Sequence, residues 1–290
     1  MNDFVIMTDS SCDLPAALAE EMELTVLPLY VDVDGQKYTN YLDEREISFA
    51  EIYAKLRTKC PAKTSAVNMN DFMEPMESLL AAGKDVLYIG FSSGLSGTFN
   101  AGALAARELS EKYPERKAFA VDSLCASMGQ GLLVWHAWRE KQKGATIEQV
   151  RDFVENTKLH LCHWFTIDDL MFLKRGGRVS GATAVVGSML SIKPVMHVDN
   201  DGHLIKVGTA RGRKASIRAL AEKAGKLGVN LSEQTVFISH GDCIDDANYL
   251  ADIMRTHYGV KDVVISYVGP VIGAHSGPGT VALFFLGSER

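Results

Sequence analysis

The sequence has few prolines and few cysteines, and it has no long apolar run. Its 290 residues include 8 prolines and 25 glycines, and 47% are hydrophobic, which excludes collagen-like repeats and wholesale disorder. The five cysteines (12, 60, 125, 162 and 243) are odd in number and form no CxxC pair, so we expect a reduced, cytoplasmic protein.

The most apolar windows (131–137, 181–192 and 279–287) are shorter than the roughly 18 residues of a membrane-spanning helix. We also expect no signal peptide, because the first residues lack a basic region and a cleavage site.

An excess of positive charge is missing as well. The formal net charge is −6 at pH 7, whereas dedicated nucleic-acid-binding proteins usually carry a basic balance, so we expect no nucleic-acid partner. Within residues 206–226, however, seven lysines and arginines stand against a single acid, Glu222. This basic segment is either a solvated helix face or a docking patch for an acidic partner or an anionic ligand.

Several motifs of catalysis and nucleotide binding are absent. The sequence contains no GxxxxGK, no GxSxG and no HExxH, which removes the Walker loop, the nucleophile elbow and the zincin helix. Residues 277–282 match GxGxxG/A, but a strand rather than a helix is predicted to follow, so we interpret the match as chance. His160, Cys162 and His163 are too few ligands for a metal, and we predict neither a metal site nor a cofactor.

Alternating strands and helices predict a first α/β domain over residues 1–155. We expect strands at 4–8, 25–33, 85–91 and 118–122 and helices at 48–56, 70–80, 99–112 and 130–143. Asp13 and Pro15 predict a further helix start after the first strand. Nearly continuous apolar strands between helices indicate a mainly parallel sheet that is covered on both faces.

The second half predicts an α/β domain of another kind over residues 156–290. The segments 191–198 and 203–209 flank the turn sequence DNDG, which indicates a β-hairpin. Three more strands are expected at 235–239, 263–268 and 280–286, with helices at 213–227 and 245–257. A hairpin next to strand–helix units predicts a mixed sheet.

The loop Ser92–Thr98 (SSGLSGT) is the most informative segment. It holds four hydroxyl groups and two glycines between a predicted buried strand and a helix. Such a loop presents unpaired backbone N–H groups at the positive end of the helix dipole, and glycines let an anion approach closely. The pattern favours a bound carboxylate or phosphate, although a helix cap alone would use the same residues.

Three other segments are candidates for a site. Lys63-Thr64-Ser65 precedes a predicted helix and is typical of a helix cap region. The segment 173–181 (LKRGGRVSG) is a basic, glycine-rich turn that either binds an anion or links two helices. The irregular loop 269–279 contains one titratable residue, His275, and loops of this kind position side chains over clefts.

Taken together, these segments resemble the DegV family of bacterial fatty-acid-binding proteins. The resembling pieces are TDSSCDLP (8–15), KTS (63–65), SSGLSGT (92–98), VDS (121–123), LKRGGRVSG (173–181), SIKPVMHVDNDGHL (191–204), TARGRKAS (209–216), ISHGD (238–242) and GAHSGPGT (273–280). They follow in order and cover the chain from end to end. The resemblance implies two α/β domains with a tunnel at their junction for one long-chain fatty acid, such as palmitate or oleate.

The resemblance also implies the residues that hold the ligand. The candidate fatty-acid-binding residues are Thr64, Ser96, His275, Ser93, Gly97 and Arg175. Thr64 and Ser96 are expected to hydrogen-bond the carboxylate, with His275 beside the same head group. A carboxylate in a low-dielectric cleft needs strong donors or a counter-charge, which a protonated His275 would supply. We expect leucine, isoleucine, phenylalanine and some methionine around the acyl chain.

Proteins of this kind also act as carriers. The resemblance implies that the bound fatty acid is presented to a separate ATP-dependent fatty acid kinase, with residues 211–218 as the candidate docking face. We therefore interpret the protein as a lipid-binding carrier without catalysis of its own. Two alternatives stay open: a serine-dependent acyl hydrolase that uses Ser96 or Ser93 with His275, and a nucleic-acid-linked regulator that uses the basic segment.

Overall fold

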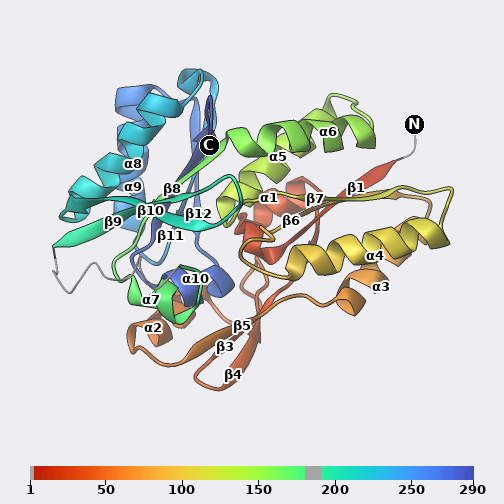
Figure 1. Ribbon diagram of the computed structural model, residues 1–290, viewed down its shortest axis with the longest axis horizontal. Helices are drawn as coiled ribbons and strands as arrows, with labels where there is room; N and C mark the ends of the chain where they lie inside the picture. The colour runs from red at the N-terminus through yellow and green to blue at the C-terminus, as the bar shows by residue number, and fades with distance from the viewer. Residues whose placement is uncertain (1–2, 180–190) are drawn as a thin grey trace.

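The computed structural model describes residues 3–179 and 191–290, and its first half is built on a four-stranded sheet (Figure 1). The sheet has the order β2-β1-β6-β7, and every pair in it is parallel. Its strands are β1 (Phe4–Asp9), β2 (Thr25–Leu27), β6 (Asp85–Gly90) and β7 (Ala118–Asp122). The prediction of a parallel sheet in the first half is confirmed.

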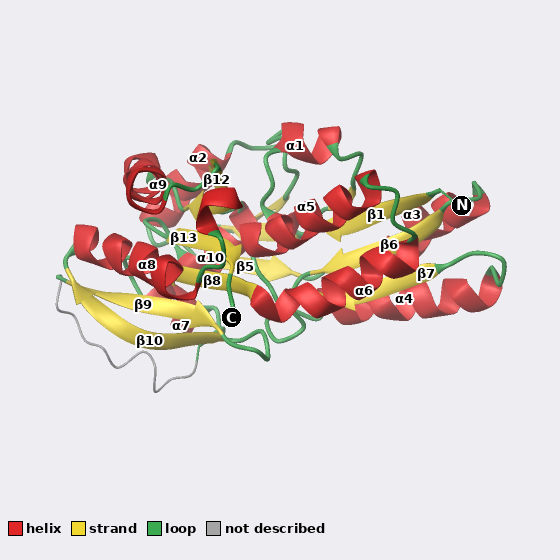
Figure 2. Ribbon diagram, turned by 90° about the horizontal axis from the view of Figure 1, so that it is seen from above, coloured by secondary structure: helices red, strands yellow, loops and turns green. Residues whose placement is uncertain are grey.

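Helices cover both faces of this sheet. One face carries α3 (Met69–Ala81) and α4 (Thr98–Lys112), and the other carries α5 (Met128–Gln142) and α6 (Ile147–Thr157), as Figures 1 and 2 show. Side chains of β6 alternate between the two layers: Val86 and Tyr88 pack with α3 and α4, and Leu87 and Ile89 pack with α5. Every residue of β6 is buried as a result, as a central strand covered on both faces requires.

The second half is built on a mixed six-stranded sheet of order β10-β9-β8-β13-β11-β12. Its strands are β8 (Leu161–Thr166), β9 (Ile192–Val198), β10 (Leu204–Arg211), β11 (Thr235–His240), β12 (Asp262–Tyr267) and β13 (Val281–Leu286). The pair β11–β12 is parallel and the other pairs are antiparallel, so the predicted mixed sheet is confirmed. The outer face packs against α8 (Arg213–Leu227) and α9 (Ile244–Tyr258), and the inner face turns toward α5.

The register of the central strands decides which side chains face inward. His163 of β8 pairs with Phe284 of β13, while Ala282 of β13 pairs with Ser239 of β11. Residues that pair directly lie on the same face of an antiparallel sheet, and alternate residues along a strand share a face. These four side chains therefore form one inner surface, directed at the first half of the molecule.

A third, three-stranded sheet was not expected. Residues 25–33 were predicted as one strand, but β2 ends at Leu27, and β3 (Tyr30–Val33) belongs to an antiparallel sheet of order β4-β3-β5. The chain changes sheets at Pro28, which has no N–H group to continue a ladder. β4 (Gln36–Thr39) and β5 (Ala62–Ser65) complete the small sheet at the lower edge of Figure 1.

The new sheet corrects the interpretation of the KTS segment. Thr64 lies in β5 and not in a helix cap region, because the chain pairs with β3 at this position. The cap of α3 is Asn68, which accepts hydrogen bonds from two backbone N–H groups of the first turn. Ser48 caps α2 (Phe49–Arg57) in the same manner, where a helix was predicted.

Three further expectations need correction. The loop 269–279 is largely helical, because α10 (Pro270–Ser276) begins at a proline in its first turn. The segment 173–181 contributes to α7 (Met171–Arg175), and its last two residues lie outside the described part of the chain. Asp13 does not cap α1 (Ala16–Glu21); it adopts a left-handed conformation with φ 51° and directs its carboxyl inward.

The predicted boundary at residue 155 falls inside α6, and we keep the division into residues 1–155 and 156–290 as a proposal. Side chains bond across the contact between the halves. Arg57 of α2 pairs with Asp242, and Ser92 donates to the carbonyl of Gly202 at 2.9 Å. Within the described residues, no helix combines the length and the apolar character that crossing a membrane requires.

Candidate functional site

A cavity of about 280 Å³ lies between the inner face of the six-stranded sheet and elements of the first half. β5 and the Ser92–Thr98 loop contribute walls from the first half, and β8, β11, β13 and α10 contribute walls from the second. The volume is close to the lower end of the roughly 300–1,000 Å³ range of small-molecule sites. The cavity thus lies at the junction where the resemblance implied a ligand.

The walls are mostly apolar, with a smaller set of polar groups. The apolar lining residues are Leu29, Ala66, Phe91, Leu95, Ala126, Phe165, Leu173, Val198, Leu204, Val268, Val271, Ile272, Ala282 and Phe284. The polar ones are Thr64, Ser65, Ser96, Ser127, His163, Arg178, Ser239, His275, Ser276 and Thr280. Methionine, which we expected around the acyl chain, is missing from the described lining, because the described methionines that are buried pack in the cores. An apolar sleeve with polar groups at a few positions suits an amphipathic ligand.

Thr64 and His275 form the central polar pair of the cavity. The Thr64 Oγ1 and His275 Nε2 atoms lie 2.7 Å apart, which joins β5 to the last turn of α10. Both side chains are partly buried and line the cavity. The structure therefore brings these two candidate residues together in one wall of the cavity.

His275 is held neutral in this environment. Burial, with the nearby positive charge of Arg178, lowers the pKa of His275 to about 4. A protonated imidazole, which we expected as the counter-charge, is thus disfavoured in the unliganded cavity at neutral pH. The Nδ1 atom is buried without a hydrogen-bond partner among the described residues and faces the backbone of Gly176.

Ser96 lines the same cavity from the loop before α4. Its Oγ accepts the N–H of Thr98 at 3.3 Å and lies 3.0 Å from the Thr98 hydroxyl. Most backbone N–H groups of the loop already have an acceptor: those of Gly94, Leu95 and Ser96 donate to oxygens of Ser92, and that of Ser92 donates to the carbonyl of Cys125.

Gly97 differs from the rest of that loop. It lines the cavity, and its N–H has no acceptor among the described residues. Because the loop precedes a helix, such a free N–H is a donor available to an anion. The expected cradle of several loop N–H groups is thereby reduced to Gly97 and the hydroxyl of Ser96.

The structure separates the remaining predicted residues from the cavity. Ser93 is exposed, and its backbone N–H donates to Asp122 at 3.2 Å. Arg175 is exposed too, with its guanidinium 4.7 Å from the centre of the Phe172 ring. Arg178, three residues later in the same basic turn, lines the cavity instead. Arg175 is the last residue of α7, whereas Arg178 lies beyond the helix in the turn that follows.

A second polar cluster was missed by the sequence analysis. Ser127 Oγ lies 2.5 Å from Asp13 Oδ2 and 2.9 Å from Ser239 Oγ. Asp13 is 3% exposed, and burial raises its pKa to about 8. Ser127 stands before α5 in a strained conformation, with φ 53° and ψ −145°. The TDSSCD segment was the available signal, since it brings Asp13 to this position.

The serine-hydrolase alternative requires a hydrogen bond between Ser96 and His275. His275 Nε2 bonds to Thr64, and Ser96 bonds to Thr98, so the hydrogen bond that the Ser96–His275 alternative requires is not formed. Only Asp199, Asp201 and His203 lie close enough together, within the described chain, to resemble a metal site. The Asp199 carboxylate there accepts two backbone N–H groups of its own turn, which accounts for its position.

The chain is similar to known proteins over nearly its full length. The sequence model of the family described as uncharacterised protein, DegV family, matches residues 3–288. A DegV domain-containing protein of Clostridium perfringens is 44% identical over 290 residues, which is 100% of this chain and 99% of the relative.

Solved structures of similar proteins share the fold. A fatty-acid-binding DegV family protein of Thermus thermophilus aligns with a TM-score of 0.89 and 29% identity, over 99% of this chain and 100% of that one. A DegV lipid-binding protein of Thermotoga maritima aligns with a TM-score of 0.88 and 30% identity, over 99% of both chains. From the family match and these similarities it follows that the chain belongs to the DegV family.

Proposed function

We propose that this protein binds one long-chain fatty acid, such as palmitate or oleate, with the acyl chain in the cavity and the carboxylate at Thr64 and Ser96. The observation that carries the proposal is the Thr64–His275 pair, 2.7 Å apart, in the wall of an otherwise mostly apolar cavity. The solved DegV relatives from Thermus and Thermotoga, described as binding fatty acid or lipid, support it.

The protonation of His275 determines whether Thr64 can donate to the ligand. A neutral imidazole carries its proton on Nε2 or on Nδ1. With the proton on Nε2, the ring donates to Thr64 Oγ1, and the threonine hydroxyl keeps its own proton for the carboxylate. With the proton on Nδ1, that hydroxyl proton is used on the ring instead. The binding-competent tautomer is therefore the Nε2–H form, which makes His275 a positioning residue for Thr64.

The remaining negative charge needs a counter-charge. Arg178 lines the cavity, and among the described residues no carboxylate pairs with it. Its guanidinium instead donates to the carbonyl of Gly176 in the same turn. Arginine keeps its charge when partly buried and binds carboxylates strongly, so we assign the ionic contact with the head group to Arg178.

The experiment that tests fatty-acid binding starts from the purified protein. Native mass spectrometry, followed by denaturing extraction, should identify a fatty acid bound in a one-to-one ratio. Delipidated protein should then take up palmitate or oleate, and hexadecanol, which has the chain without the carboxylate, should bind at least tenfold more weakly. A protein that is free of lipid after purification and takes up neither acid contradicts the proposal.

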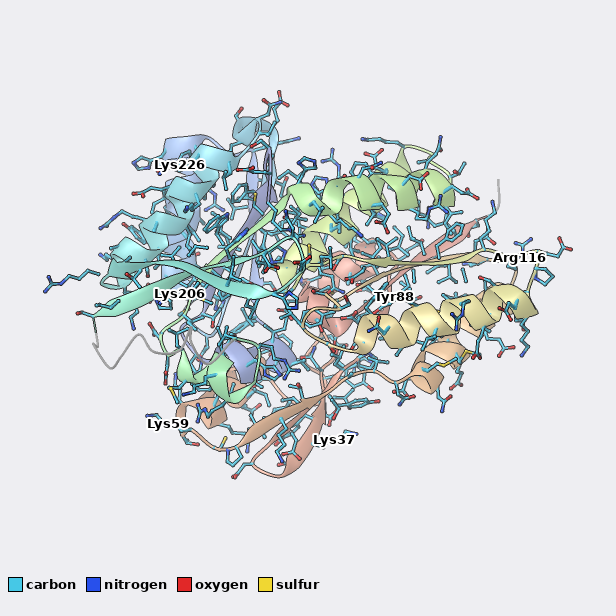
Figure 3. All side chains as sticks on the ribbon, in the orientation of Figure 1. Lys37, Lys59, Tyr88, Arg116, Lys206 and Lys226 are labelled. Atoms are coloured by element: carbon cyan, nitrogen blue, oxygen red, sulfur yellow. The ribbon has the colours of Figure 1, made fainter. Side chains whose placement is uncertain are left out.

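The proposed function extends to presentation of the bound fatty acid to an ATP-dependent fatty acid kinase. We retain the segment 211–218 as the candidate docking face, but its basic side chains are not equally free to contact a partner. Arg213 already pairs with Asp246 at 2.8 Å, whereas Arg211 and Lys214 are exposed. Lys226, another basic side chain of this half, is exposed as well (Figure 3).

Charge reversal at the exposed positions tests the docking face. Carrier-dependent formation of acyl phosphate by a purified fatty acid kinase should fall at least fivefold with Arg211→Glu and Lys214→Glu combined. Lys59→Glu, an exposed change on the other half of the molecule, serves as the matched control. Equal turnover with the unaltered protein, the double variant and the Lys59→Glu control would contradict this assignment of the docking face.

A further inference from the structure

The cavity extends along one face of the strand β13. Thr280, directly before the strand, and Ala282 and Phe284 within it occupy every second position, and all three line the cavity. Alternate residues of a strand share a face, and the four residue steps from Thr280 to Phe284 span about 13 Å. The Thr280 hydroxyl donates to the carbonyl of Gly277 at 2.8 Å, immediately after the last turn of α10, which holds His275. Phe284 therefore lies at the end of the cavity that is distant from His275.

The distant end is formed by a pair of rings. His163 of β8 pairs with Phe284, lines the cavity beside it and meets its ring edge to face, with 4.9 Å between the ring centres. The next pair on the same face of the sheet is Leu161 and Leu286. Neither leucine belongs to the lining that the described residues form, and Leu161 is fully buried in the core behind the rings. The described cavity therefore ends at His163 and Phe284.

The imidazole of His163 fills the space between the sheet and α5 at this end. A Cβ atom added to Gly129, in the first turn of α5, would lie 2.0 Å from His163 Nε2 and 2.2 Å from Cε1. The far edge of the ring thus rests directly on the helix backbone, and the side chain as a whole is 2% exposed. Contacts this close are typical of a packed interior, so the ring closes the gap between β8 and α5 to an acyl chain.

We propose that His163 is the end wall of the acyl-chain cavity and determines the longest acyl chain that the protein accepts. The inference rests on the proposed fatty-acid function, in which the carboxylate lies at Thr64 and Ser96. Packed interiors resist added atoms, so a chain whose last carbon reaches the ring gains no contact from further carbons and must displace the wall to fit them. Gly129 belongs to the same device, because the absence of a Cβ atom there lets the ring lie back against the helix.

A series of saturated fatty acids from 12 to 22 carbons, bound to the delipidated protein, tests the inference. Competition against a fluorescent fatty acid gives their relative affinities and hence the chain length that binds most tightly. His163→Ala removes the ring, so the preferred acid should become longer by at least two carbons. Gly129→Ala forces the ring away from the helix and toward the cavity, so the preferred acid should become shorter by at least two carbons.

Two control variants separate the wall from a general loosening of the core. His163→Phe keeps a ring of similar size at the wall and should keep the preferred chain length. Leu161→Ala opens space in the core behind the wall, two residues along the same strand, and should keep it as well. Thermal melting of each variant detects loss of folding. Should His163→Ala not fold, the shift to shorter acids in Gly129→Ala decides the question.

The outcomes distinguish this inference from the proposed function. If the acids bind and the preferred chain length is the same in the unaltered protein, His163→Ala and Gly129→Ala, the end wall is refuted while fatty-acid binding stands. An equal shift to longer acids in Leu161→Ala and His163→Ala would also refute it, because the chain would then reach past the ring. If no acid of the series binds the unaltered protein, the proposed function itself fails.

Discussion

Thr64 Oγ1 and His275 Nε2 lie 2.7 Å apart although 211 positions separate the two residues in the sequence. The contact exists only because β5 and α10 pack together, and α10 belongs to the half of the chain that forms the other large sheet. The polar end of the cavity is consequently formed by the tertiary fold and not by any one motif. Substitutions there are expected to affect binding more than folding.

Removing the head-group hydroxyls should weaken fatty-acid binding. Thr64→Val keeps the branched shape that suits β5 and deletes the donor, and Ser96→Ala deletes the second one. Each change should cost about 1–3 kcal/mol of binding free energy, the range for a hydrogen bond to a charged group. Isothermal titration with oleate measures this loss.

The control for these variants is Ser93→Ala, in the same loop but exposed and outside the cavity lining. It should bind oleate like the unaltered protein. Full affinity in both Thr64→Val and Ser96→Ala would place the carboxylate elsewhere in the cavity.

The two arginines of the basic turn should differ in importance. Arg178 lines the cavity, whereas Arg175 stacks on Phe172 at the surface. Arg178→Ala should weaken oleate binding about tenfold, because a partly buried ionic hydrogen bond is lost. Arg175→Ala should change it less than twofold. Competition against a fluorescent fatty acid at two salt concentrations compares the variants, and equal losses would contradict the assignment.

A side chain at Gly176 should displace His275. A Cβ atom there would lie 2.2 Å from His275 Nδ1, so the ring must move and its bond to Thr64 must lengthen. Gly176→Ala is expected to weaken oleate binding at least fivefold. Gly208→Ala is the matched control, because open space surrounds the position where its Cβ would lie. Unchanged affinity in Gly176→Ala would show that His275 does not position Thr64.

The buried carboxyl of Asp13 should make stability depend on pH. Its pKa rises from 3.8 to about 8 on folding, mainly through burial. Between these values the folded protein holds a proton that the unfolded chain has released, so the free energy of unfolding falls as pH rises. The slope from this group reaches about 1.4 kcal/mol per pH unit at most and vanishes above pH 8.

Urea unfolding from pH 5 to pH 9 tests this dependence. As the pH rises to about 8, the free energy of unfolding of the unaltered protein should fall relative to that of Asp13→Asn. Above that pH, the difference between the two proteins should stay constant. Asp3→Asn, at an exposed position, is the matched control. Parallel curves for the unaltered protein and Asp13→Asn would mean that Asp13 is ionised in the fold.

Much of the fold could be predicted from periodicity. β6 is a run of apolar residues bounded by polar ones, and α4 and α8 have helical spacing, so their type was clear. The switch at Pro28 was missed, because one proline in an apolar run does not reveal that the next strand joins another sheet. α10 was missed because glycine and proline dominate its neighbourhood, although Pro270 stands where a helix tolerates it.

The site was also predictable in part, because several of its residues lie in distinctive sequence segments. Thr64, Ser96 and His275 stand in distinctive segments, and all three line the cavity. The Ser127 cluster could not be predicted from the sequence. Asp13 follows β1, Ser127 lies at the start of α5 and Ser239 lies in β11, and no sequence pattern links these three positions. The choice between Arg175 and Arg178 depends on the residue at which α7 ends, which spacing alone does not determine.

The contact between Ser92 and the carbonyl of Gly202 has a thermodynamic consequence. It ties the loop beside the cavity to the β9–β10 hairpin, and Arg290 adds bonds to the carbonyls of Leu124 and Asp199 from the same region. A bound ligand stabilises the folded state in proportion to the logarithm of its concentration over its dissociation constant. Since both halves supply the cavity walls and are joined at this contact, that stabilisation extends to both. Amide hydrogens in the parallel sheet and in the mixed sheet should therefore slow their exchange together as fatty acid is added.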